Sequence, residues 1–137
     1  MKRVALALLV ACGAPAGPST PVVRPEKTLQ INTTGQAVDL VPQLAPGYVT
    51  VVDFWADYCG ACTVVGGMLA VQVAQEPSIV IRKIDVGDSD TPVAKQYDIG
   101  ALPHFRLYDK RGQMRYVIVG NDTLQAPTLA KQLAAEP

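Results

Sequence analysis

The sequence has few histidines and cysteines, no concentrated basic stretch and no hydrophobic run long enough to cross a membrane. Its 137 residues include one histidine and three cysteines, at positions 12, 59 and 62. The 12 basic and 12 acidic side chains cancel, and no stretch gathers the basic residues that a nucleic-acid binder needs. The apolar run at residues 4–11 is much shorter than the roughly 20 residues of a transmembrane helix. We therefore expect neither nucleic acid nor a membrane span.

The length and composition fit one ordinary domain. Apolar residues make up 49% of the chain, which is enough for a hydrophobic core. The odd number of cysteines leaves one thiol without a partner inside the chain, and in an exported protein such a cysteine needs its own explanation.

The N-terminus supplies that explanation. Lys2 and Arg3 precede the apolar run, as in a secretory signal peptide. The run ends in Leu-Val-Ala-Cys at residues 9–12, which resembles the bacterial lipobox. We therefore expect residues 1–11 to be a signal peptide of the lipoprotein type. A lipid on Cys12 would attach the protein to a membrane of the cell envelope, facing the periplasm or extracytoplasmic space. An ordinary signal peptide with an incidental cysteine is the alternative.

Residues 12–26 predict a tether between this anchor and the folded domain. Residues 13–26 contain four prolines and two glycines and lack a periodic apolar pattern, which is typical of a flexible linker. Fully extended, such a segment reaches roughly 45 Å. We expect the folded domain to occupy residues 27–137.

Within that domain the sequence alternates between strand and helix patterns. Dense β-branched and aromatic runs predict buried strands, alternating or shorter runs predict further strands, and apolar residues at helical spacing predict helices. The expected strands are residues 28–32, 48–55, 79–86, 104–108 and 115–119, and the expected helices are residues 37–44, 60–75, 92–97 and 129–135, with Pro127 as an alternative start of the last one. This order predicts an α/β fold with a central mixed β-sheet flanked by helices.

The Cys-Gly-Ala-Cys stretch at residues 59–62 is the strongest chemical signal. A zinc site needs about four ligands, but His104 is the only histidine and no second cysteine pair follows. A structural disulfide would close a very short loop and so constrain the unfolded chain little. A redox centre fits better, because the pair follows a buried strand and opens a helix, whose N-terminus favours a thiolate.

The surrounding residues carry a family resemblance. Val-Asp-Phe-Trp-Ala-Asp-Tyr-Cys-Gly-Ala-Cys at residues 52–62 resembles the active-site segment of thioredoxin. The similarity continues through residues 81–86, 97–113 and 118–120 to the last helix, and so covers roughly residues 27–135. The Asp-Phe-Trp before the cysteines and the Leu-Pro far downstream make this match much more specific than a cysteine pair alone.

The resemblance implies a thioredoxin-like fold and a role for each matching residue. Cys59 corresponds to the exposed nucleophile and Cys62 to the buried resolving cysteine of a redox disulfide. Asp53 corresponds to the buried acid that assists proton transfer at the resolving thiol, and Lys83 to a lysine near that acid. The residues expected at the substrate-binding surface are Trp55, Tyr58, Gly60, Ala61, Leu102 and Pro103, with Pro103 in the cis conformation.

The sequence also departs from the usual thioredoxin pattern. Tyr58 and Ala61 replace the usual tryptophan and proline, and Gly66-Gly67 occupies the region of a mid-helix proline. His104 follows Pro103 where threonine is usual, and it would tune Cys59, touch substrate or be an ordinary surface histidine. These changes affect the redox potential and the partner more than the exchange chemistry.

The resemblance predicts a thiol–disulfide oxidoreductase, specifically a protein-disulfide reductase. Leu102 before Pro103 resembles reductases more than oxidases, so we expect reduction or isomerisation of disulfides in extracytoplasmic proteins. Expected partners are protein thiols or disulfides and an upstream electron donor. We expect a monomer with no metal and no cofactor beyond the Cys59–Cys62 disulfide. An electron relay, including one for cytochrome c maturation, and a binding module with idle cysteines are the alternatives.

Overall fold

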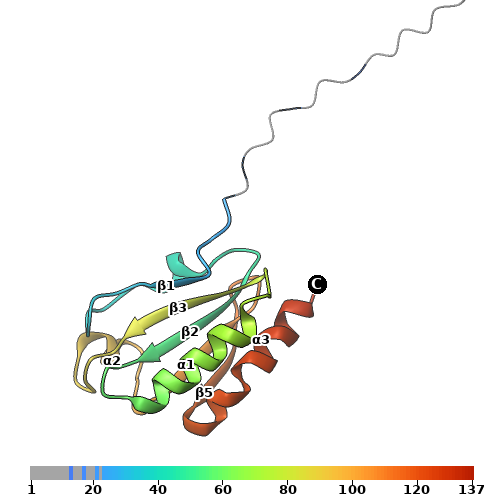
Figure 1. The fold of residues 1–137 in the computed structure, drawn as a ribbon. Helices are drawn as coiled ribbons and strands as arrows, with labels where there is room; N and C mark the ends of the chain where they lie inside the picture. The colour runs from blue at the N-terminus through green and yellow to red at the C-terminus, as the bar shows by residue number, and fades with distance from the viewer. Residues whose placement is uncertain (1–12, 14–16, 18–20, 22) are drawn as a thin grey trace, which may run out of the picture.

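The structure, a computed structural model, describes Gly13, Gly17, Pro21 and residues 23–137 (Figure 1). The expected signal peptide and Cys12 lie outside the described residues.

A five-stranded sheet forms the centre of the domain (Figure 1). Its order is β1-β3-β2-β4-β5, with β1, β3 and β2 parallel and with β4 antiparallel to both of its neighbours. The strands are β1 (Thr28–Gln30), β2 (Val49–Trp55), β3 (Ile79–Asp85), β4 (His104–Tyr108) and β5 (Met114–Val119). The expected mixed sheet is therefore confirmed, and its order, which the sequence pattern leaves open, places β2 at the centre.

The helices cover both faces of the sheet. Helices α1 (Gly60–Val73) and α3 (Ala126–Ala135) lie side by side on one face, and α2 (Pro92–Gln96) packs on the other (Figure 1). A 3₁₀ segment, η2 (Gly120–Gln125), precedes α3.

The helix expected at residues 37–44 is wrong, because only a 3₁₀ turn, η1 (Val41–Gln43), forms there. In a helix that began near residue 37, Pro42 would have no amide to donate to the carbonyl of Val38, and its ring would clash with that carbonyl. The Asp39 side chain also accepts a hydrogen bond from the Val41 amide, which satisfies that amide locally instead of within a helix.

The alternation of side chains along β2 divides the core in two. Val49 and Val51 point to the face covered by α1 and α3, whereas Val52 and Phe54 point to the face covered by α2. The same alternation places Asp53 on the side of α1. A carboxylate thus occupies a position that the pattern of the strand reserves for an apolar side chain.

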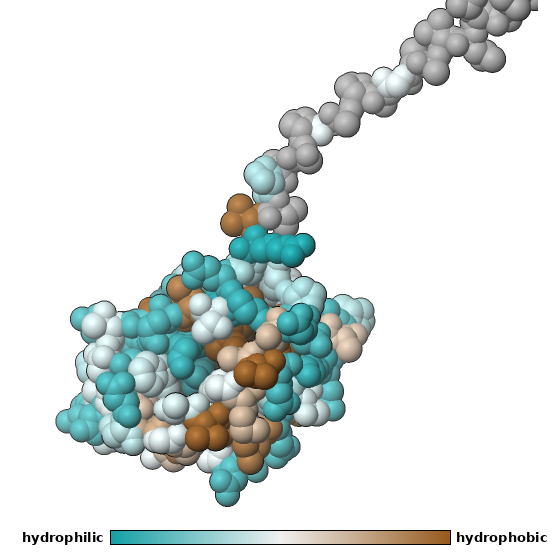
Figure 2. All heavy atoms as spheres, in the orientation of Figure 1, coloured by the Kyte–Doolittle hydropathy of each residue, from teal (hydrophilic) through white to brown (hydrophobic). Residues whose placement is uncertain are grey.

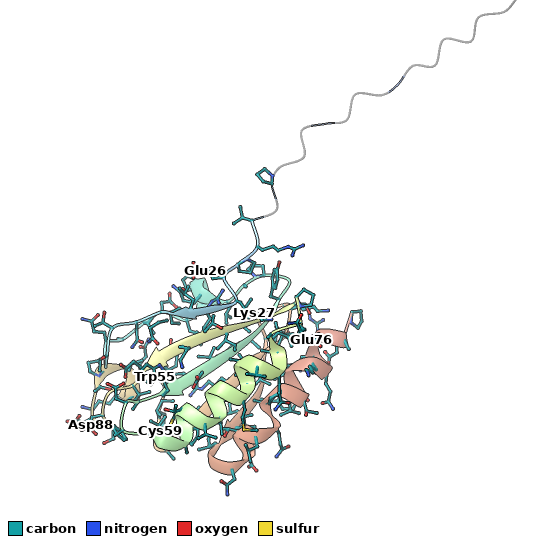
Figure 3. All side chains as sticks on the ribbon, viewed as in Figure 1. Glu26, Lys27, Trp55, Cys59, Glu76 and Asp88 are labelled. Carbon is teal, nitrogen blue, oxygen red and sulfur yellow. A yellow bond between two sulfur atoms is a disulfide. The ribbon has the colours of Figure 1, made fainter. Side chains whose placement is uncertain are left out.

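The chain enters the domain at the end of α1 that lies away from the cysteines. The Lys27 ammonium donates a hydrogen bond to the backbone carbonyl of Glu76, just beyond the last turn of α1. Figure 3 shows Lys27 and Glu76 together at one end of the helix and Cys59 at the other. In the part of the chain that is described, no helix is long and apolar enough to cross a membrane.

Candidate active site

The two cysteines lie where β2 turns into α1. After β2 ends, the Cys59 amide donates to the Ala56 carbonyl at 3.0 Å, which closes a tight turn. Cys59 is the N-cap of α1, and its sulfur accepts a hydrogen bond from the Cys62 amide at 3.1 Å. The two sulfurs form a disulfide. An amide at a helix N-terminus that points at this sulfur would stabilise it as a thiolate after reduction.

The two sulfurs differ in their access to solvent. Cys62 is 2% exposed and faces the core, whereas Cys59 is partly exposed at the start of the helix. An incoming sulfur atom therefore reaches Cys59 first.

Asp53 lies behind the pair on the central strand. It is 1% exposed, and the register of β2 and β3 places it directly opposite Lys83. The Lys83 ammonium approaches Asp53 Oδ2 at 3.4 Å. Asp53 Oδ1 has no hydrogen-bond partner among the described residues. A buried carboxylate oxygen without a partner lowers stability, because it loses its hydration and gains no hydrogen bond in return. Such a group in a folded protein therefore suggests a functional role.

Burial dominates the ionisation of this carboxyl group. It raises the pKa of Asp53 from its ordinary value of 3.8 to about 6, although the charge of Lys83 and its hydrogen bond act in the opposite direction. A group with a pKa of about 6 can take up and release a proton near neutral pH.

Asp53 and Cys62 line the same pocket, which has a volume of about 320 Å³. Trp55 and Lys83 form part of its wall, and the Lys83 ammonium lies 4.9 Å from the centre of the Trp55 ring. Trp55 Nε1 donates to Gln30 on β1 at 3.1 Å, which fixes the indole beside the pocket. The pocket gives Asp53 and Cys62 a common environment for proton transfer.

A second pocket, of about 270 Å³, is lined by Cys59, the other cysteine of the pair. Cys59 shares its wall with Tyr58, which is 69% exposed, and with Leu102. The Leu102–Pro103 peptide bond is cis, as the resemblance implied. Gly60 and Ala61 are exposed next to Cys59. The structure thus brings Tyr58 and Leu102 into one pocket wall with Cys59, while Pro103 follows Leu102 as a buried residue.

Comparison with known proteins agrees with this geometry. The family model described as Thioredoxin matches residues 39–135, which is most of the chain. The chain belongs to the thioredoxin family. Thioredoxins are disulfide oxidoreductases, and the Cys59–Cys62 disulfide gives this thioredoxin-like chain the pair that this chemistry requires.

Individual relatives support the same assignment. The chain is 33% identical over 70 residues to thioredoxin from Mycoplasma pneumoniae, covering 51% of this chain and 67% of that protein. It is 35% identical over 91 residues to an H-type thioredoxin from Oryza sativa subsp. indica, covering 65% of this chain and 72% of the relative. The crystal structure of Malassezia sympodialis thioredoxin has a TM-score of 0.57 and 26% identity, with 70% of this chain and 86% of that chain covered.

Two further side chains of this thioredoxin-like site do not line the pocket beside Cys59. Trp55 lines the Asp53 pocket with Cys62, not the pocket beside Cys59. His104 is not a surface histidine, because it is 5% exposed and packs edge-on against Phe54 on the α2 face of the sheet. Burial, with the nearby Arg106 charge, lowers the pKa of His104 to about 4, so the imidazole is neutral near neutral pH.

The sequence did not reveal that Gly66 lies against Asp53 in the thioredoxin-like site. A Cβ atom at this position would lie 3.1 Å from Asp53 Oδ2, whereas one at Gly67 would have no neighbour within 4 Å. Only the packing of α1 against β2 distinguishes the two glycines, which are equivalent by composition and spacing. Among the described residues, no group of three or more histidine, cysteine or acidic side chains is arranged to hold a metal.

Proposed function

We propose that this protein is a lipid-anchored, extracytoplasmic thiol–disulfide oxidoreductase that reduces or isomerises disulfides of cell-envelope proteins. The observation that carries the redox part is the Cys59–Cys62 disulfide at the start of α1, with Cys59 accessible and Cys62 buried beside Asp53. The envelope location rests on the sequence before the domain, where the lipobox-like residues 9–12 follow a charged start and an apolar run.

The first chemical step is capture of the substrate. With the pair reduced, the Cys59 thiolate attacks one sulfur of a substrate disulfide, as thiol–disulfide exchange requires. A bond forms between Cys59 and that sulfur, the substrate S–S bond breaks, and the other substrate sulfur leaves as a thiolate and takes up a proton. The amide of Cys62, which points at the sulfur of Cys59, favours the attacking thiolate.

The second step is resolution. Cys62 gives its proton to Asp53 and attacks Cys59, so that the Cys59–Cys62 disulfide forms and the second substrate thiolate leaves. The substrate gains two electrons and two protons, and a dithiol electron donor returns the pair to its reduced form. Lys83, which lies against Asp53, stabilises the carboxylate that accepts the proton.

The chain enters the domain far from the redox pair. Helix α1 has 14 residues and so separates its two ends by about 21 Å. A tether that enters beside Glu76 therefore joins the domain at the opposite end of α1 from Cys59.

Trapping of mixed disulfides tests the chemistry in cells. Cys62→Ser should accumulate mixed disulfides through Cys59 with envelope proteins, because capture survives and resolution is lost. Cys59→Ser should trap few. A redox-idle binding module would trap none with either variant, whereas an electron relay would trap thiol carriers or apocytochrome in place of diverse envelope proteins.

A separate experiment tests the anchor. The mature protein should partition into detergent and begin with a lipid-modified Cys12, and Cys12→Ser should release it or leave it unprocessed. A soluble wild-type protein that begins at another residue would contradict this part of the proposal and leave the redox part intact.

A further inference from the structure

Helix α1 lacks the charged outer face that a surface helix usually has. No charged residue occurs between Tyr58 and Gln75. The inner face of α1 consists of the buried residues Cys62, Val65, Leu69 and Val73. On the outer face, Val64, Met68 and Val71 are 62%, 42% and 77% exposed. A helix that is apolar on every side is usually buried, so the outer face of α1 suggests a surface that something else covers.

The three exposed side chains form one row, which we call the α1 stripe (Val64, Met68 and Val71). Their spacing is i, i+4 and i+7, which places them within an arc of about 60° on the helix surface. Gly60, beside Cys59, lies on the same side of the helix at its N-terminal end, about 20° outside this arc. In Figure 2, hydrophobic surface lies over α1 in the orientation of Figure 1.

The α1 stripe continues the surface on which the exchange reaction takes place. The partner sulfur must reach Cys59, and the exposed Gly60 and Ala61 connect Cys59 to Val64 without a charged or bulky side chain between them. Val71, twelve residues after Cys59 on the helix, lies about 18 Å further along the axis. An extended partner segment covers this distance with about six residues.

We propose that the α1 stripe is the docking surface for the protein that exchanges with Cys59, and that this partner carries uncharged, apolar residues within about six positions of its reactive cysteine. The inference rests on the proposed function and adds the chemical class of the partner. The absence of charge along the stripe favours an apolar segment, since a charged one would lose hydration against it without gaining an ion pair.

Single-turnover kinetics with two peptide probes test this inference. Each probe is a 14-residue peptide whose single cysteine forms a mixed disulfide with 2-nitro-5-thiobenzoate. In one peptide the third to sixth residues on both sides of the cysteine are Leu, Val or Ala, and in the other they are Asp and Lys in equal numbers. The pre-reduced full-length protein supplies the two electrons. The symmetrical small disulfide of 2-nitro-5-thiobenzoate serves as a third probe that is too small to reach Met68.

The variant to compare with the wild type is Met68→Gln/Val71→Gln, which removes two apolar side chains without adding charge. Val41→Gln is the matched control, because Val41 is 75% exposed on η1, outside α1. We expect the wild type to react with the apolar peptide at least tenfold faster than with the charged one. The double variant should lose most of this preference, Val41→Gln should keep it, and the small disulfide should react equally with all three proteins.

Other results would overturn the inference in distinguishable ways. Reduction of the small disulfide without a preference for the apolar peptide, or with a preference that survives the double substitution, would exclude the stripe as the docking surface. A dimer that the double variant dissociates, again without peptide preference, would assign the face to a second copy of this chain. Binding to phosphatidylglycerol vesicles that the double variant loses, without a peptide preference, would assign the α1 stripe to the membrane. Failure to reduce any of the three probes would instead refute the proposed function.

Discussion

Replacing Asp53 by asparagine should stabilise the oxidised protein, by an amount that depends on pH. Burial raises the pKa of Asp53 from 3.8 to about 6. Above about pH 6 the folded protein therefore holds an ionised carboxylate in its interior, and this lowers its free energy of unfolding. At about 1.4 kcal/mol per pKa unit, this difference corresponds to about 3 kcal/mol at neutral pH. Asparagine keeps the size of the side chain and has no charge. Lys83, whose side chain is 32% exposed, remains partly hydrated when it loses its partner.

The sign of the effect follows from where the two states bind protons. Below about pH 4 the carboxyl is protonated in both the folded and the unfolded chain, so the two proteins should differ little in stability. As the pH rises from about 4 to 6, the unfolded chain releases its proton first, and the wild type loses stability relative to Asp53→Asn. The full advantage of the variant, about 1–3 kcal/mol, should be present above about pH 6.5. His104, which also titrates in the acid range, contributes equally to both proteins and cancels in the difference.

Urea denaturation of both oxidised proteins between about pH 4 and pH 7.5 measures this difference directly. The same preparations should show slower insulin-disulfide reduction by the variant at neutral pH, because Cys62 loses its proton acceptor. A variant that is less stable than the wild type at every pH, with normal turnover, would show that Asp53 is a structural residue and remove it from the mechanism.

Two further expectations concern the neighbours of this carboxylate. Gly66→Ala should raise the pKa of Asp53 and move the pH dependence of insulin reduction upward, because the new methyl group lies 3.1 Å from Oδ2 and adds to the burial of the carboxylate. Gly67→Ala, whose methyl group has no neighbour within 4 Å, should stabilise α1 by about 1 kcal/mol in thermal or urea denaturation and leave the pH dependence in place. His104→Gln should keep the wild-type pH profile of insulin reduction between about pH 5.5 and 8, because the pKa of His104 is about 4, and loss of a titration step near pH 6 would contradict this.

Much of the fold was predictable from the sequence because the periodic signals are strong. The buried runs that become β2 and β3, and the helices after the cysteine pair and at the C-terminus, appear close to their expected bounds. The strand order depends on which strands pair, and side-chain periodicity carries no such information. The error at residues 37–44 arose because an apolar pattern of helical spacing competed with Pro42 and with the Asp39 side chain, and the local backbone preferences won.

Site residues that belong to a sequence motif were predictable, whereas those whose role depends on how the helices pack were not. The Cys59–Cys62 pair and Asp53 follow from the motif, and the register of β2 and β3 brings Lys83 opposite Asp53. The closeness of Gly66 to Asp53 depends on how α1 packs. The α1 stripe was hidden because all apolar residues of α1 suit a helix equally well, and only the structure separates the buried ones from the exposed ones. The lack of charge from residue 58 to residue 75 is the one feature of the sequence that could have indicated such a surface.

The most direct test of the central claim is a single-turnover reaction between the pre-reduced protein and excess insulin. If Cys59 and Cys62 act as an exchange pair, each molecule should transfer two electrons to an insulin disulfide. Mass spectrometry should then find the Cys59–Cys62 disulfide on every molecule that reacted, with no stable mixed disulfide left. A protein that keeps both thiols reduced while insulin stays oxidised would contradict the account and reduce the chain to a thioredoxin fold without the exchange activity.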